Sequence, residues 1–352
     1  MKRSSQMGLL YFVIHLLVEI TSFYIMTGYF KSPFVWGLSL LYDFAAFVPQ
    51  GFFGYLRDKG IRINFALVGT ILTSLSLILM FFDSNAFLVT AIVSLGNCLV
   101  HIHGAELTLR TSPGRISPAA VFVSGGSFGV VIGKLLSTHL CGIPWVLGLN
   151  LLTFVPIMIA ERIQADGGEE NLRQYRFSND KINSIVVILL ATFVVAVRAY
   201  MGYGIPTSWN KTEIQMIALY FCMGIGKGLG GILTDRIGIR LTALISTVGA
   251  LPFMVFGENL MAVSLIGITF FSMTMAVSLA LIVSRLQRHP GVAFGFTTAG
   301  LFLGTLPFFF FRVHSVLTNC IIITLLTIPC VVILWIICRK KSAKEHPDME
   351  GQ

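Results

Sequence analysis

The sequence has little charge and no polar stretch long enough to form a soluble domain. Only 12% of its 352 residues are charged, whereas 55% are hydrophobic, and the mean hydropathy is +0.83. A soluble protein carries roughly 25% charged residues. A buried core cannot absorb so much apolar surface, so the surrounding medium must be lipid. We therefore expect an all-α polytopic membrane protein.

Several site patterns are also missing. The six cysteines form no CxxC motif and no cysteine–histidine spacing typical of a metal site, so we expect neither a disulfide framework nor a bound metal. The glycine-rich run GKGLGG, residues 226–231, lacks the residue order of a nucleotide-binding P-loop. No paired carboxylates or nucleophile–base spacing indicate an enzyme. We expect no cofactor, so a proton gradient or another ion gradient would supply the energy for transport.

Hydrophobic runs long enough to cross a bilayer fill most of the chain. A transmembrane helix needs about 20 apolar residues. The sequence predicts twelve such helices, at residues 7–28, 33–55, 63–82, 86–109, 118–138, 142–160, 183–204, 213–233, 240–257, 260–283, 291–311 and 316–338.

The net charge of +9 is distributed according to side. When the N-terminus and every second connection are assigned to one side of the membrane, that side holds 19 of the 25 lysines and arginines. Cytoplasmic loops carry such an excess, so both termini are expected in the cytoplasm. This sidedness explains the charge without a nucleic-acid partner. We expect a monomer in the plasma membrane, which is the inner membrane in bacteria, with the bilayer and a small-molecule substrate as partners.

The two halves of the chain share landmarks. The longest polar stretch, residues 161–181, follows the sixth segment and separates six segments from six. We predict an N-terminal six-helix bundle at 1–160, a cytoplasmic loop at 161–182, a C-terminal six-helix bundle at 183–338 and a cytoplasmic tail at 339–352. GYLRDKGIR follows the second segment of the first half, and GILTDRIGIR follows the second segment of the second half. A repeat at half the chain length is typical of a two-bundle transporter.

These two loop copies are expected to act as gates at the cytoplasmic side. Glycine permits tight turns and close helix approach. An aspartate at a helix end can cap a neighbouring helix N-terminus and pair with arginines. The alternative is a pair of charged turns that only set topology. The residues assigned to the gating loops are Gly54, Asp58, Lys59, Arg62, Gly231, Asp235, Arg236 and Arg240.

The second loop copy resembles the signature loop of the major facilitator superfamily, and the resemblance covers essentially the whole chain. It implies two pseudo-symmetric six-helix bundles around a central cavity that opens alternately to each side. Three shorter runs resemble the first, fourth and fifth helices of the fosmidomycin-resistance efflux proteins: HLLVE at 15–19, VHIH at 100–103 and VFVSGGSFGVVIGKLL at 121–136. His103 stands where that family carries an acid, which suggests a different substrate.

Charged residues inside the segments are functional candidates, because a charge at the bilayer centre costs roughly 2.5–3.5 kcal/mol on insertion scales. Glu19, Asp43 and Arg198 fall at a similar depth near mid-membrane. They could form a charge network that couples a proton to conformational change. His101 joins this group because histidine titrates near neutral pH. The alternatives are a static structural pair for the charges and a hydrogen-bonded packing role for the histidine.

A second group of polar residues is predicted to line the substrate cavity. His15 and Glu19 share one face of the first helix, and Asn97 and His101 share one face of the fourth, because each pair is four residues apart. The predicted cavity residues are His15, Asn97, His101, Lys134 and Lys227.

The remaining polar and small residues have structural interpretations. Lys134 could instead extend towards the outer surface. His103 lies on a different helix face from the predicted cavity residues, and Glu106 is expected to pair with Arg110 near the cytoplasmic side. The glycines assigned to helix packing are Gly125, Gly129, Gly133, Gly300 and Gly304.

Together these observations predict a secondary active transporter that moves a small, anionic or amphiphilic molecule by alternating access. Proton-coupled export is the first hypothesis. A proton symporter or facilitator for nutrient uptake stays open, because the same fold serves both directions. A membrane receptor or scaffold without flux is a remote alternative, which the intramembrane charges disfavour.

Overall fold

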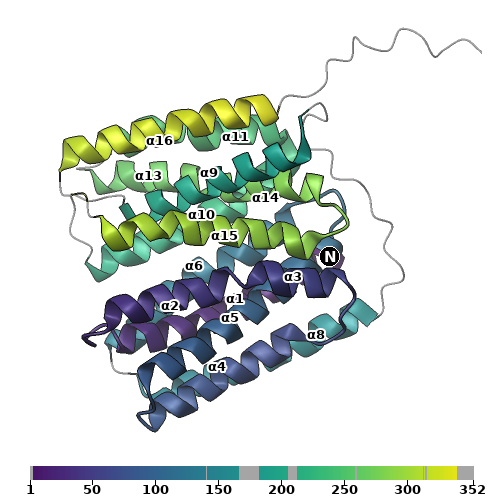
Figure 1. Ribbon diagram of the computed structural model, residues 1–352, viewed down its shortest axis with the longest axis vertical. Helices are drawn as coiled ribbons and strands as arrows, with labels where there is room; N and C mark the ends of the chain where they lie inside the picture. Colours follow the sequence, from purple (N-terminus) through teal and green to yellow (C-terminus); the bar gives the residue numbers. More distant parts are fainter. Residues whose placement is uncertain are drawn as a thin grey trace, which may run out of the picture.

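The computed structural model contains sixteen α-helices within the residues that it describes, which are 3–139, 141–165, 182–204, 212–257, 260–311, 313 and 315–338. The helices lie side by side with roughly parallel axes, α1–α8 in the lower part of Figure 1 and α9–α16 in the upper part. Most of the predicted loop 161–182 and the whole predicted tail 339–352 lie outside the described residues.

Eight helices come from the first half of the chain. They are α1 (Arg3–Gly28), α2 (Val35–Phe47), α3 (Gln50–Asp58), α4 (Phe65–Phe81), α5 (Ala86–Arg110), α6 (Ser117–Thr138), α7 (Ile143–Leu151) and α8 (Phe154–Ala165). Eight more come from the second half. They are α9 (Ser184–Gly204), α10 (Glu213–Ile237), α11 (Ile239–Thr247), α12 (Ala250–Phe256), α13 (Met261–Ser272), α14 (Thr274–Arg285), α15 (Pro290–Phe310) and α16 (Val316–Ile337).

Four of the predicted segments are each divided between two successive helices. These pairs are α2 with α3, α7 with α8, α11 with α12, and α13 with α14. Pro49, Pro156 and Pro252 lie at or shortly after three of the breaks. Proline lacks an amide hydrogen and its ring clashes with the preceding turn, so it interrupts a helix at these points.

The length and composition of the helices fit a bilayer. Among the described residues, ten helical stretches are long and apolar enough to cross a membrane, and Phe65–Phe81 is a shorter apolar helix. The expected multi-pass membrane protein is confirmed at this level. The count of twelve crossings and the side on which the termini lie stay predictions.

The two halves pack tightly against each other at glycines of α3 and α10. A Cβ atom added to Gly54 of α3 would collide with the backbone of Gly291 in α15, and one added to Gly231 of α10 would collide with the Ala120 side chain in α6. Both contacts lie at the end of the molecule that carries Asp58 and Asp235, called below the Asp58–Asp235 end. Glycine is required there because any side chain would push the halves apart.

The glycines assigned to packing lie against helices of their own half. Cβ atoms at Gly125, Gly129 and Gly133 of α6 would collide with backbone carbonyl oxygens of α1. Cβ atoms at Gly300 and Gly304 of α15 would meet the backbone of α9 in the same way. These close approaches fix α1 against α6 and α9 against α15, and the four helices border the space described next.

Candidate functional site

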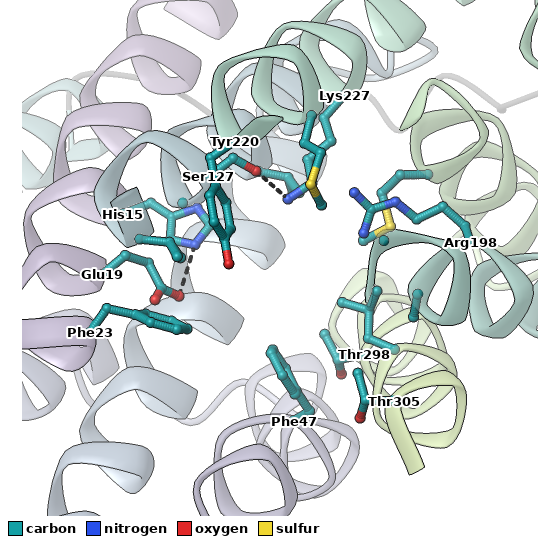
Figure 2. A pocket seen from close by; sticks show the side chains of 18 of the residues that line it. His15, Glu19, Phe23, Phe47, Ser127, Arg198, Tyr220, Lys227, Thr298 and Thr305 are labelled. Atoms are coloured by element: carbon teal, nitrogen blue, oxygen red, sulfur yellow. Dashed lines mark hydrogen bonds and ion pairs between the residues drawn. The ribbon is translucent and has the colours of Figure 1, made fainter. Parts of the chain in front are cut away.

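A cavity of about 310 Å³ lies between the two halves of the molecule (Figure 2). Helices α1, α5 and α6 contribute to one wall, and α9, α10 and α15 contribute to the other. The charged and histidine side chains that line it are His15, Glu19, His101, Lys134, Arg198 and Lys227. The cavity therefore combines one carboxylate and two imidazoles with three basic groups.

Glu19 is the centre of a buried cluster on the α1–α5 wall. Its Oε1 lies 3.5 Å from His15 Nε2 and 3.4 Å from His101 Nε2. The His15 Nδ1 lies 2.9 Å from the carbonyl oxygen of Phe122, and the His101 Nδ1 lies 3.0 Å from that of Asn97. Because a carbonyl oxygen only accepts, each Nδ1 is assigned as the donor, and each Nε2 is left facing Glu19.

Asn97 lies behind this cluster and not on the cavity wall. Its Nδ2 is 3.1 Å from Glu19 Oε1, 3.0 Å from Ser22 Oγ and 3.1 Å from the Tyr42 hydroxyl. Its side chain is completely buried, and it is not among the described residues that line the cavity. The expectation that it lines the cavity is therefore corrected. Packing of α1 and α2 over α5 covers Asn97, which holds the carboxylate in place instead.

The opposite wall is cationic. Lys227 of α10 donates to Ser127 Oγ across 2.8 Å, and Arg198 of α9 points into the same space (Figure 2). Lys134 of α6, on the first wall, donates to the Tyr220 hydroxyl of α10 across 2.9 Å. These positive groups would attract an anion, because a charge interaction is stronger in a confined, partly dry cavity than in water.

Asp43 is not among the described residues that line the cavity, although it interacts electrostatically with Glu19. It is 8% exposed and lies within hydrogen-bonding reach of the Thr305 hydroxyl, at the seam between α2 and α15. Glu19 and Arg198 line opposite walls of the cavity. The ion pairs that Glu19 makes with described residues are those with the two histidines. A joint role of these residues in proton coupling stays a prediction.

Two aspartates connect the halves at the Asp58–Asp235 end. Asp58 of α3 accepts hydrogen bonds from the amides of Gly291 and Val292, at 3.0 and 2.9 Å, at the start of α15. Asp235 of α10 accepts two bonds of 2.9 Å from the amides of Ile116 and Ser117, at the start of α6. Each carboxylate thus caps a helix of the other half, where the free amides and the helix dipole favour negative charge.

The arginines beside these aspartates differ from those expected. Arg110, the last residue of α5, lies 4.0 Å from Asp58, and Arg115 lies 3.8 Å from Asp235. By contrast, the loop residue Arg240 lies 3.9 Å from the centre of a tryptophan ring of α16. The expectation that each aspartate pairs with an arginine of its own loop is corrected. The end of α5 and the turn after it lie beside the aspartates and supply the arginines instead.

Glu106 joins two arginines near the same end. Arg110 Nε lies 2.5 Å from its Oε1, as the four-residue spacing predicts, and Arg57 Nη2 lies 2.9 Å from its Oε2. His103 is buried outside the cavity, with Nε2 3.8 Å from a carboxylate oxygen of Glu161. The Arg57 contact was not predicted, because α3 and α5 are adjacent only in the folded chain.

Exposed side chains bridge the opposite end of the molecule. The Trp36 Nε1 of α2 donates to the carbonyl oxygen of Phe309 in α15 across 3.1 Å. His139 and Glu213 form a 2.9 Å pair between the ends of α6 and α10. These contacts depend on side chains that can rotate away, whereas backbone packing and buried caps close the Asp58–Asp235 end.

No pattern in the sequence indicates that three potential metal ligands converge. Ligand atoms of His15, Glu19 and His101 all lie within 4.8 Å of one another. The four-residue spacing of the first two is visible in the sequence, but His101 comes from a distant helix. The expectation that no metal site exists rested on short-range spacing, which this arrangement does not have.

Comparisons with known proteins agree with this architecture. No protein-family model matches the chain. The fosmidomycin resistance protein of Escherichia coli is 22% identical over 296 residues, which cover 74% of this chain and 72% of the relative. This similarity confirms the resemblance seen in the sequence.

Solved transporter structures cover almost the whole chain. The E. coli fucose:proton symporter FucP has a TM-score of 0.66 and 15% identity, over 93% of this chain and 97% of that one. A bacterial homologue of the iron transporter ferroportin, in an outward-facing state, has a TM-score of 0.64 and 13% identity, over 95% and 98%. FucP in its outward conformation, described as a major facilitator superfamily transporter, has a TM-score of 0.66 and 14% identity, over 94% and 97%. The chain therefore has the fold of the major facilitator superfamily, a family of transporters and not of enzymes, and is similar in sequence to a resistance protein of that kind.

Proposed function

We propose that this protein is a secondary active transporter that exports a small anionic molecule by alternating access, in exchange for protons. The observation that carries the proposal is the pair of opposed cavity walls. A buried carboxylate with two histidines faces Arg198 and Lys227 across the space between the halves. A proton bound on the first wall would change the electrostatic potential at an anion bound near the second wall, and the anion would change the potential at the proton.

The contacts at the two ends support alternating access. The Asp58–Asp235 end is closed by paired aspartate caps, and the positive-inside pattern predicts that this end faces the cytoplasm. Helix caps can break and re-form as the halves rock against each other. Export is favoured over uptake by the similarity to a resistance protein.

Uptake by proton symport is the second candidate function. It is favoured by the similarity in fold to a fucose:proton symporter, in which substrate and proton move together. The two candidates place the same residues in the cavity and differ in the direction in which the proton gradient drives the substrate. A flux measurement with the gradient imposed in each direction distinguishes them.

The test is transport by the purified protein in proteoliposomes with an imposed pH gradient, beginning with fosmidomycin and other small anions. We expect the wild type to move substrate in the direction opposite to the flow of protons down their gradient. Glu19→Gln should abolish gradient-driven accumulation but retain substrate binding, measured by thermal stabilisation. Glu213→Gln is the matched control, because it alters a histidine–carboxylate pair outside the cavity. If Glu19→Gln accumulates substrate as the wild type does, coupling at this residue is excluded.

A further inference from the structure

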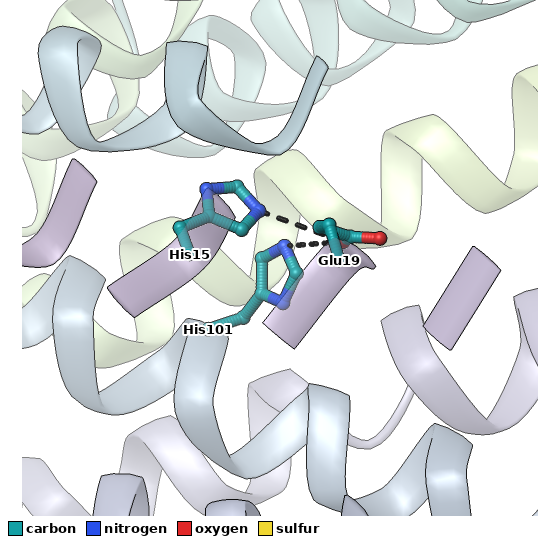
Figure 3. Close-up of side chains that lie close together, drawn as sticks. All are labelled: His15, Glu19 and His101. Atoms are coloured by element: carbon teal, nitrogen blue, oxygen red, sulfur yellow. Dashed lines mark ion pairs between the residues drawn. The ribbon is translucent and has the colours of Figure 1, made fainter. Parts of the chain in front are cut away.

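Three potential metal-ligating atoms converge on the cavity wall (Figure 3). They are His15 Nε2, His101 Nε2 and a carboxylate oxygen of Glu19, and the three side chains are only 4–7% exposed. Two imidazoles and one carboxylate are a ligand set that suits divalent transition metals. The hard cations Mg²⁺ and Ca²⁺ prefer oxygen ligands and would be disfavoured here.

The histidine orientations leave electron pairs without a hydrogen between them. Each Nδ1 donates to a backbone carbonyl oxygen, at 2.9 Å for His15 and 3.0 Å for His101. When neutral, each ring therefore has a bare Nε2, and both point at the same oxygen of Glu19. Such an arrangement repels itself unless a cation lies between the three atoms. A backbone acceptor on the far ring nitrogen is also how metal-binding histidines are usually oriented.

Two of the three separations match those between the ligands of one tetrahedral ion, and the third is at most 4.8 Å. Metal–ligand bonds of about 2.0–2.2 Å place two ligand atoms of a tetrahedron roughly 3.4 Å apart. The two nitrogen–oxygen distances are 3.5 and 3.4 Å. The second oxygen, Glu19 Oε2, is buried and has no hydrogen-bond partner among the described residues. Small movements would therefore bring all three groups onto one ion.

The surrounding helix leaves room for the cluster. A Cβ atom at Gly126 of α6 would collide with the His15 imidazole, and one at Gly129 would lie 2.6 Å from Glu19 Cβ. Asn97 donates to the carboxylate oxygen from behind. All three residues line the cavity, so a solute or water in it could supply further ligands.

We propose that His15, Glu19 and His101 bind a divalent transition-metal ion, such as Zn²⁺, Co²⁺ or Fe²⁺, in the central cavity. The metal occupies the place that a proton takes in its absence, so protons and metal compete for one site. This inference rests on the proposed function in treating the cavity as the solute pathway. Binding itself needs no gradient and no membrane, so it can be tested separately from transport.

The test is titration of the tag-free, full-length protein in detergent with Co²⁺ alone, followed by visible absorption. We expect saturable binding with the spectrum of nitrogen-coordinated, low-coordinate Co²⁺. Mutating a group that only orients a metal ligand typically weakens metal binding about 10- to 100-fold. We expect a larger loss for each of the ligand variants His15→Ala, His101→Ala and Glu19→Gln. Asn97→Leu should fall within that smaller range. His139→Gln, which alters an exposed histidine–carboxylate pair, should bind as the wild type does.

Two results would overturn the proposal. One is a wild type that shows no saturable Co²⁺ spectrum, which would mean that the cluster serves protons only. The other is Co²⁺ binding that survives both histidine substitutions in protein whose thermal unfolding is unchanged. Loss of proton-driven flux with Co²⁺ binding intact would instead contradict the proposed function and leave the metal site standing. Normal flux without Co²⁺ binding would contradict the metal site and leave the proposed function standing.

Discussion

Replacing Asp58 with alanine should open the Asp58–Asp235 end. The carboxylate accepts hydrogen bonds of 3.0 and 2.9 Å from the first amides of α15. Without it, both amides lack a partner in the closed form, whereas water can bind them in an open form. Loss of an aspartate cap costs about 0.5–2 kcal/mol. The closed form should therefore lose about 2- to 30-fold in population relative to the open form.

Asparagine at the same position separates shape from charge. Burial raises the pKa of the Asp58 carboxyl above its ordinary value, and the two backbone donors offset only part of this effect. The buried charge therefore opposes closure, although the hydrogen bonds favour it. Asp58→Asn keeps one acceptor oxygen and removes the charge, so we expect it to weaken closure less than Asp58→Ala does.

The same shift in pKa predicts how pH affects closure. Nearby Glu106 raises the Asp58 pKa further and Arg110 lowers it, but burial is the largest influence. Asp58 therefore binds a proton more tightly in the closed form than in an open form where it faces water. Lowering the pH through the interval between these two pKa values should favour closure, and raising it should favour opening. Spin labels at the exposed Lys59 and His289 would report the separation of α3 and α15 at the Asp58–Asp235 end. A separation that grows on acidification would contradict the argument.

Amide hydrogen exchange is the assay for the cap itself. In Asp58→Ala, exchange should accelerate most at the start of α15, by up to the factor calculated above, and less at the start of α6. Asp235→Ala is the mirror control, because its carboxylate makes the equivalent bonds to α6. If neither variant changes exchange or transport, the two caps do not stabilise the closed form and the gating role is refuted.

Three further predictions concern packing and charge. Gly54→Ala should reduce transport strongly because its Cβ would collide with the Gly291 backbone, whereas Gly51→Ala, whose Cβ meets no atom within 4 Å, should transport normally in the same flux assay. Glu106→Gln should lower the thermal unfolding temperature. Breaking a buried ion pair typically costs about 3–5 kcal/mol in free energy of unfolding, and we expect a cost at or below the lower end because one of the arginine partners is 40% exposed. An unchanged unfolding temperature would show that the two ion pairs do not stabilise the fold. Lys227→Met should tighten Co²⁺ binding, because this lysine interacts electrostatically with both histidines of the cluster, and equal or weaker binding would contradict that coupling.

The sequence by itself determined the medium, the helical architecture and the positions of the two capping aspartates. Long apolar segments require lipid and internally satisfied backbone groups, so they specify helices without reference to their neighbours. The repeated loop places Asp58 and Asp235 at equivalent helix ends, and an aspartate at such a position favours capping wherever a helix N-terminus lies within reach. The local chain therefore carries enough information for these features.

Only the tertiary structure decided which polar groups share a site. Asn97 and His101 occupy the same face of α5, yet packing of α1 over that face buries the first and leaves the second at the cavity. Glu19 contacts His101 because α1 packs against α5 with both residues at the same height and on facing sides of the two helices. No local sequence pattern encodes this arrangement. Convergence of three ligand atoms depends on the relative placement of two helices, and composition and spacing do not record that placement.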